Sequence, residues 1–222
     1  MTPRFRLIGT DADVILDAPR LIIAGYTGRN EAAVTAHIAE LAAIGIPPPA
    51  SVPAFFVLDP SLVTSDPVVT ISGSNTSGEV EPVLIRHKGR HYLGVGSDHT
   101  DRDVERSDIA ASKAACPKPV GHQVVALPDD LAMLDWDAIG VESDVDGEPY
   151  QRGSLAAMRT PTDLLSRMTS TLGQVKDDLV IFCGTVPLLT GAFRAGRHWR
   201  VQLTLNSTTA LVHTYEVLPH DG

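Results

Sequence analysis

The sequence has only two cysteines and four lysines among its 222 residues, and aromatic residues make up 5% of it. Cys116 and Cys183 are too far apart for a zinc motif, and two cysteines make no disulfide framework. Basic residues are not in excess, because 18 Lys and Arg face 27 Asp and Glu for a net charge of −9. General nucleic-acid binding, which needs a basic patch, is therefore not expected.

Long apolar stretches are also missing. No run approaches the roughly 20 residues of a membrane span, and the N-terminus lacks the apolar core of a signal peptide. We therefore expect a cytoplasmic protein that contacts neither a membrane nor nucleic acid.

The residues that are present form the pattern of a globular, mostly β protein. Hydrophobic residues make up 43% of the chain and charged residues 20%, and a chain of this length can fold without disulfides. Residues 4–26, 180–182 and 201–205 are typical of strands. Apolar residues at helical spacing indicate one helix over 30–44, whose first residue can cap it, and another over 161–175. The pattern predicts an α+β fold, predominantly β, with a few short helices.

The most informative segment is a predicted hairpin that carries three carboxylates. A two-residue turn at Lys88-Gly89 fixes how every residue of its two strands pairs. Glu79 then lies opposite Asp98, and Glu81 shares the strand face with Glu79, one diagonal away. Three carboxylates this close repel one another unless a cation lies between them. An all-oxygen set suits Mg²⁺, Mn²⁺ or Ca²⁺ better than zinc.

Simpler interpretations of this hairpin compete with a metal site. Charged residues on a strand face are usually just solvated. Pro82 argues against a central strand, because proline cannot donate a ladder hydrogen bond. A three-residue turn would shift the register and separate the carboxylates.

A second candidate pair lies in the first predicted helix. His37 and Glu40 are three residues apart, so they share a helix face, and the carboxylate can orient and charge the imidazole. Such a pair can bind and deprotonate a water. The alternative is a core histidine, because His37 also falls on the apolar face of the predicted helix.

Several short motifs, in order along the chain, resemble those of the fumarylacetoacetate hydrolase superfamily. Glu79-x-Glu81, a hairpin and then Asp98-x-x-x-Arg102 resemble its metal-binding core, and His37-x-x-Glu40 resembles its catalytic dyad. Two later stretches agree as well: Asp146-Gly147-Glu148-x-x-Gln151-x-Gly153, and Asp178 through Gly184-Thr185. The set covers roughly residues 25–217, and the combination is more specific than any one motif. More narrowly, the sequence resembles the DUF2848 group.

This resemblance implies a fold, an assembly and a cofactor. The expected fold is a mixed β-sandwich roll, with an N-terminal β segment over residues 1–24 packed on a catalytic domain over residues 25–222. The family commonly forms homodimers. Glu79, Glu81 and Asp98 are expected to hold Mg²⁺ or Mn²⁺, with waters completing the shell.

The resemblance also implies roles for side chains near that cation. His37 and Glu40 would supply the base, while Lys113 would stabilise an enolate or protonate a carbanion. Lys118 is a rival for the lysine role, and a salt bridge from Lys113 to Asp108 is the simpler alternative.

Two further residues are expected to hold the substrate. Arg102 and Thr185 would grip its carboxylate, although Arg102 can instead pair with Asp101 or Asp103. One departure is that Glu105 stands where the family often has glutamine.

The expected activity is therefore that of a metal-dependent hydrolase that cleaves a C–C bond in a β-diketo or acylpyruvate-like acid. A small oxo-acid would be the substrate. Decarboxylase, hydratase or isomerase chemistry on the same scaffold is the near alternative. A non-catalytic protein that only binds a carboxylate is the alternative from another class, because a shared fold does not prove activity.

Overall fold

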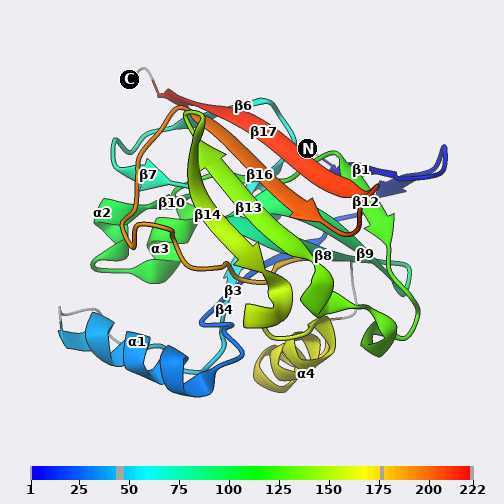
Figure 1. The fold of residues 1–222 in the computed structure, drawn as a ribbon, viewed down its shortest axis with the longest axis horizontal. Helices are drawn as coiled ribbons and strands as arrows, with labels where there is room; N and C mark the ends of the chain where they lie inside the picture. Colours follow the sequence, from blue (N-terminus) through cyan, green and yellow to red (C-terminus); the bar gives the residue numbers. More distant parts are fainter. Residues whose placement is uncertain (1, 44–47, 176–177, 221–222) are drawn as a thin grey trace.

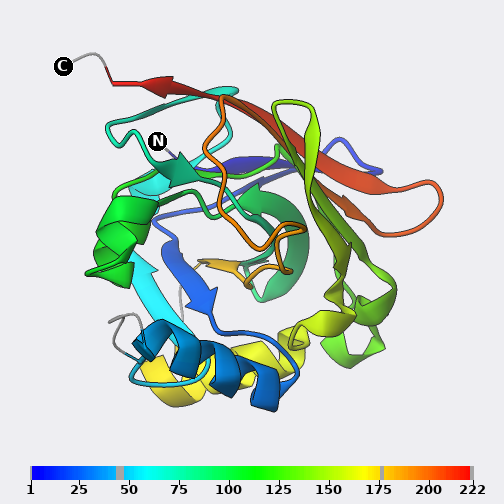
Figure 2. The same cartoon turned by 60° about the vertical axis from the view of Figure 1, so that its left-hand side comes forward.

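The computed structural model describes residues 2–43, 48–175 and 178–220. Two curled β-sheets form the body of the molecule, and short helices lie at its periphery (Figure 1). The larger sheet has the order β2-β1-β12-β9-β8-β15-β3-β4 and the smaller one β14-β13-β16-β17-β6. Turning the molecule shows that the sheets curl around a central segment between β15 and β16 (Figure 2). The mostly β, α+β fold predicted from the sequence is confirmed.

The larger sheet contains β1 (Arg4–Leu7), β2 (Asp13–Ile15), β3 (Arg20–Gly25), β4 (Ala54–Leu58), β8 (Val80–His87), β9 (Arg90–Ser97), β12 (Gln123–Ala126) and β15 (Leu179–Phe182). The smaller sheet contains β6 (Val68–Ile71), β13 (Gly140–Val145), β14 (Glu148–Ser154), β16 (His198–Thr204) and β17 (Ala210–Pro219). Two short pairs complete the strands: β7 (Thr76–Ser77) with β10 (Thr100–Asp101), and β5 (Val63–Thr64) with β11 (Lys118–Pro119).

The helices are α1 (Glu31–Ala43), α2 (Arg102–Glu105), α3 (Ile109–Ala114) and α4 (Pro161–Leu172). Single 3₁₀ turns lie at Pro60–Leu62, Leu131–Met133, Trp136–Ala138 and Leu155–Ala157. Asn30 caps α1 through a hydrogen bond from the Ala33 N–H (3.1 Å), and Thr160 caps α4. Both helices begin where the sequence predicted. None of the helices in the described ranges is long and apolar enough to cross a membrane.

Strand β8 lies at the centre of the larger sheet and is buried on both faces. Leu84 packs into the core between the two sheets, while Val83 and Ile85 pack into a second core on the other side. This double burial follows from the curl of the sheet and explains the apolar run Val83-Leu84-Ile85 in the middle of the strand. The hairpin that carries the candidate site is thus fixed from both sides.

The predicted hairpin and its register are confirmed. Strand pairing runs from His87↔Arg90 at the turn to Val80↔Ser97. Lys88 and Gly89 both have positive φ, 49° and 75°, as a two-residue turn of type I′ requires.

Pro82 does not exclude β8 from the interior of the sheet, although a proline argued against a central strand. The Pro82 carbonyl accepts a hydrogen bond from the Cys183 N–H at 3.0 Å. The nitrogen of Pro82 therefore also faces the segment after β15 and points away from β9. Regular pairing with β15 ends at Val83↔Phe182, just before that point. The missing N–H therefore breaks no bond of the β8–β9 ladder.

The N-terminal segment is part of the larger sheet. Strand β1 pairs in parallel with β12 and antiparallel with β2 at the sheet edge. Strand β3 lies further in, between β15 and β4, and extends across residue 24, where the domain boundary was placed.

Candidate active site at the end of the hairpin

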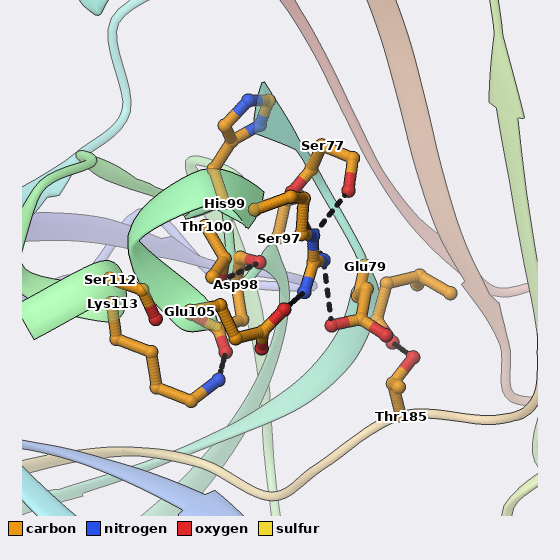
Figure 3. A network of polar contacts seen from close by, with 12 residues as sticks. Ser77, Glu79, Ser97, Asp98, His99, Thr100, Glu105, Ser112, Lys113 and Thr185 are labelled. Atoms are coloured by element: carbon orange, nitrogen blue, oxygen red, sulfur yellow. Dashed lines mark hydrogen bonds and ion pairs between the residues drawn. The ribbon is translucent and has the colours of Figure 1, made fainter. Parts of the chain in front are cut away.

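Charged side chains gather where the β8–β9 hairpin runs into β10 and α2 (Figure 3). The strand ladder continues one step past β8, because the Asp98 N–H donates to the Glu79 carbonyl at 3.0 Å. Glu79 and Asp98 are therefore opposite each other, as the two-residue turn predicted. The assignment of Glu79, Glu81 and Asp98 as metal ligands stays a prediction.

Asp98 is fully buried and contacts both candidate lysines. Lys113, from α3, donates to Asp98 Oδ2, and Lys118, from β11, lies 3.0 Å from Asp98 Oδ1. Burial alone would raise the pKa of Asp98, but the two ammonium groups outweigh it and hold that pKa well below its usual value. Asp98 is thus a permanent carboxylate.

The two lysines differ in their electrostatics. Burial lowers the pKa of each, but the carboxylates of Asp98, Glu79 and Glu81 more than compensate at Lys113 and raise its pKa. Lys118 has no exposed surface, and burial together with repulsion from Lys113 leaves its pKa lowered. Lys118 also donates to the His99 carbonyl. The alternative of a Lys113 salt bridge to Asp108 is wrong in this structure, where Asp108 caps α3 instead.

Glu81 is a buried carboxyl group with few contacts that offset the cost of burying its charge. Gly184 donates its backbone N–H to Glu81 Oε2 at 2.7 Å. Burial, and then repulsion from Asp98, raise the pKa of Glu81 well above its usual value. Gly184 has φ +94°, and a Cβ there would lie 1.8 Å from Thr27 Oγ1, so only glycine fits this turn.

Arg102 is held by acids other than its sequence neighbours. Its Nη2 donates to Glu79 Oε2 at 3.0 Å and its Nη1 to Glu105 Oε2 at 2.9 Å, while Nε donates to Ser77 Oγ at 2.7 Å. The Phe193 ring covers the guanidinium, with its centroid 3.6 Å from Cζ. The alternative pairing with Asp101 or Asp103 is wrong for the side chain of Arg102, since the Asp101 carboxylate caps α2.

Thr185 and Gln151 tie the segment after β15 to the start of β8. Thr185 Oγ1 donates to the Val80 carbonyl at 2.6 Å and accepts from Gln151 Nε2 at 2.7 Å. The Gln151 oxygen accepts from the Val80 N–H at 2.9 Å. Because the Thr185 hydroxyl proton is already donated, binding a substrate carboxylate through it would cost that hydrogen bond. Its role in substrate binding stays a prediction.

The candidate dyad belongs to α1, at the edge of the molecule (Figures 1 and 2). Glu40 is exposed in the last turns of this helix. The side chain of His37 lies outside what the structure describes, so only its place on α1 is given. The pairing of His37 with Glu40, and its role as a base, stay predictions.

Some residues of this cluster were not singled out as site residues from the sequence. Glu105 was noted only as a departure from the family, and Phe193 and Tyr26 carried no motif. Tyr26 follows β3 with φ 57°, and burial, then Glu105, raise its pKa. A strained backbone at an aromatic residue is a signal that only the structure provides.

The donor set fits a divalent cation. Among the described residues, no three His, Cys, Asp or Glu side chains already form a metal-binding group. Within the described part of the chain, Asp98 Oδ1 has an ion pair but no hydrogen bond, and Glu81 is held by a single backbone N–H among the contacts above. A cation between them would relieve the repulsion that raises the pKa of Glu81.

Solved structures of other proteins share the fold of this chain. A candidate fumarylacetoacetate isomerase/hydrolase from Oleispira antarctica matches with a TM-score of 0.67 and 22% identity, over 96% of this chain and 99% of that one. Fumarylpyruvate hydrolase from Pseudomonas aeruginosa, in complex with Mn²⁺ and pyruvate, matches with a TM-score of 0.65 and 16% identity, over 99% and 97%. A 5-carboxymethyl-2-hydroxymuconate delta-isomerase from Mycobacterium smegmatis matches with 0.64 and 16%, over 96% and 87%.

The chain thus has the fold of the fumarylacetoacetate hydrolase superfamily. A family model described as "Protein of unknown function (DUF2848)" matches residues 24–215, and the chain belongs to this family. Among curated proteins, no sequence matches it.

Proposed function

We propose that this chain is a Mg²⁺- or Mn²⁺-dependent hydrolase that cleaves a C–C bond in a β-diketo or acylpyruvate-like acid. The observation that carries the proposal is the charged cluster at the hairpin end, where three acidic side chains meet two lysines that both contact Asp98. It occurs on a fold shared with a fumarylpyruvate hydrolase whose structure contains Mn²⁺ and pyruvate.

Glu79, Glu81 and Asp98 are the residues that would hold the cation. Bound there, it would supply Lewis-acid polarisation of the substrate carbonyls. Ligation by Glu79 would also free one side of Arg102, because Glu79 now accepts from Arg102 Nη2. Arg102 then has an N–H group available for a planar carboxylate.

The reaction we propose consumes one water. Water adds to the distal carbonyl of the acylpyruvate and gives up its proton to the His37–Glu40 pair. The bond between that carbon and the methylene breaks, and its electron pair becomes the enolate of pyruvate. The proton held by the pair then passes to the methylene carbon, which gives pyruvate and a carboxylic acid and returns the pair to its starting state.

The two lysines take different parts in this proposal. Lys113 has its ammonium group in the cluster and its pKa raised, so it stays charged and can stabilise the enolate oxygen. Lys118 is fully buried against Asp98 and His99, so its proposed role is to hold Asp98 in position.

Pyruvate release from acylpyruvates, by chelator-treated protein reloaded with Mg²⁺ or Mn²⁺, tests the proposal. Glu40→Ala should lower turnover by about 10²–10⁴-fold, the usual cost of a lost general base, while the metal affinity stays unchanged. Thr35→Ala, on the same helix, is the matched control and should keep full turnover. Release of CO₂ from oxaloacetate without hydrolysis of any acylpyruvate would contradict the hydrolase and favour the decarboxylase.

A further inference from the structure

A hollow of about 540 Å³ lies at the junction of the two large sheets. It is distinct from the carboxylate cluster, and its ionisable lining side chains are Arg6, His122 and His213. No Asp or Glu is among the described residues that line it. Its lining consists of Arg6, Ser65, Pro67, His122, Gln123, Val212, His213 and Thr214.

His213 is the least satisfied group of this hollow. Its side chain is on the buried face of β17, with 6% of the residue exposed, and its Nε2 has no hydrogen-bond partner among the residues that the structure describes. A buried polar atom without a partner costs free energy, and a bound water or ion is one way in which native proteins satisfy such an atom. One face of the ring stacks on Tyr215, at 5.8 Å between centroids, so the ring is held in place.

Two further cationic or protonatable side chains complete the hollow. Arg6, on β1, is exposed; its Nη1 donates to the Asp11 carbonyl at 2.8 Å and its Nε lies 3.4 Å from Asp13. Asp13 also pairs with Arg4 at 3.0 Å, and Asp11 Oδ1 lies 4.0 Å from Arg6 Nη1, so the two guanidinium groups face two carboxylates. Arg6 Nη2 has no hydrogen-bond partner among the described residues, so it is available as a donor. His122, exposed at the start of β12, adds a second imidazole that repels a charge on His213.

Backbone N–H groups add neutral donors. Glu216 donates its N–H to the Pro67 carbonyl at 2.8 Å, across the edge of β17 that borders the hollow. Alternate residues of a strand direct their N–H groups to the same side. Thr214 therefore directs its N–H towards this edge, and regular pairing with β6 begins only at Glu216↔Val68.

We propose that this hollow is a binding site for a small oxyanion, a carboxylate or a phosphate, held by Arg6, His122 and His213. A charge-assisted hydrogen bond from a guanidinium, together with hydrogen bonds from imidazole N–H groups, is the kind of contact that such anions form in proteins. The site is independent of the proposed catalytic function, because none of these residues belongs to the carboxylate cluster.

The test uses the whole, metal-free chain at constant ionic strength, titrated separately with inorganic phosphate and with malonate. The ring signals of His122 and His213 in NMR spectra report on the hollow directly. We expect saturable shifts of both rings with at least one anion at or below about 10 mM. The anion that binds more tightly identifies the class of ligand.

Substitutions separate this site from the carboxylate cluster. Arg6→Gln and His122→Gln should each weaken the binding by about tenfold, as expected for loss of a charge-assisted contact. Arg90→Gln, an exposed arginine on β9 outside the hollow, is the control and should leave the affinity unchanged. The proposal is overturned if neither anion gives a saturable shift. It is equally overturned if Arg90→Gln weakens binding as much as Arg6→Gln, or if only Arg102→Gln abolishes it.

Discussion

The β8–β9 hairpin and helix α1 carry the two halves of the proposed active site, but they are held in opposite ways. The hairpin is buried on both faces, and the carboxylates of Glu79 and Asp98 at its end pair with side chains from α2, α3 and β11. All described side chains of α1 are exposed or half-buried. Its first residue, Glu31, is tied to Arg159 at 2.9 Å and to Arg167 at 3.7 Å.

This difference separates two kinds of contribution. The hairpin end must tolerate buried charge, so its residues determine stability as well as the proposed ligand binding. The described side chains of α1 contribute little to the core, so changes to them should alter the proposed site while leaving the fold intact. The predictions below test that contrast, in order of decreasing effect.

The largest effect is expected at the hairpin end. Asp98→Asn leaves the ammonium groups of Lys113 and Lys118 buried without their shared counter-ion. Removing one partner of a buried ion pair typically costs about 3–5 kcal/mol, which urea unfolding of the metal-free protein would measure. Asp103→Asn, an exposed position on α2, should cost little. Equal losses at the two positions would show that the lysine contacts do not stabilise the hairpin.

His213, on β17, should make a pH-dependent contribution of about 3 kcal/mol to the free energy of unfolding. Burial, and then repulsion from His122, lower the pKa of His213 to about 4. An unfolded histidine binds a proton near pH 6.5. Stability from this group is therefore full above pH 6.5 and is lost as the pH falls towards 4.

Unfolding measurements between pH 7 and 4 check this effect. His213→Gln should show a flatter decline than the wild type, and the exposed His220→Gln should not. A decline of the same slope in all three proteins would assign the acid sensitivity to other groups.

The smallest effect is expected at the anchor of α1. Glu31→Gln removes the charge that contacts Arg159 and Arg167 on the solvent side. Hydrogen exchange of α1 amides should accelerate while the global unfolding midpoint hardly changes, because the helix buries little of the core. Glu142→Gln, whose carboxylate forms ion pairs on the smaller sheet, should leave exchange in α1 as it is. A large fall in global stability with Glu31→Gln would contradict the peripheral role of α1.

The sequence predicted the hairpin well because its geometry is local. A two-residue turn at Lys88-Gly89 fixes the register of both strands, so the position of Glu79 opposite Asp98 follows without knowledge of the rest of the fold. The starts of α1 and α4 are equally local, since capping residues act on the N–H groups just after them.

The sequence could not predict the partners of the charged residues, because these partners come from distant segments. The choice between Lys113 and Lys118 depended on whether α3 or β11 brings its lysine to Asp98, and both elements do. The nearest acids, Asp101 and Asp108, were plausible partners, yet each caps a helix instead. The apolar spacing of α1 predicted a buried face, but the described part of the helix lies on the periphery, where burial depends on tertiary contacts.

The most direct test of the account is calorimetric titration of Mn²⁺ and Mg²⁺ into chelator-treated wild type, Glu81→Gln and Glu105→Gln. Both variants remove a carboxylate from the same cluster, but only Glu81 is assigned to the metal. The account predicts one ion bound per chain, a loss of affinity of at least about tenfold in Glu81→Gln, and near wild-type binding in Glu105→Gln. No binding to the wild type, or the same loss in both variants, would contradict it.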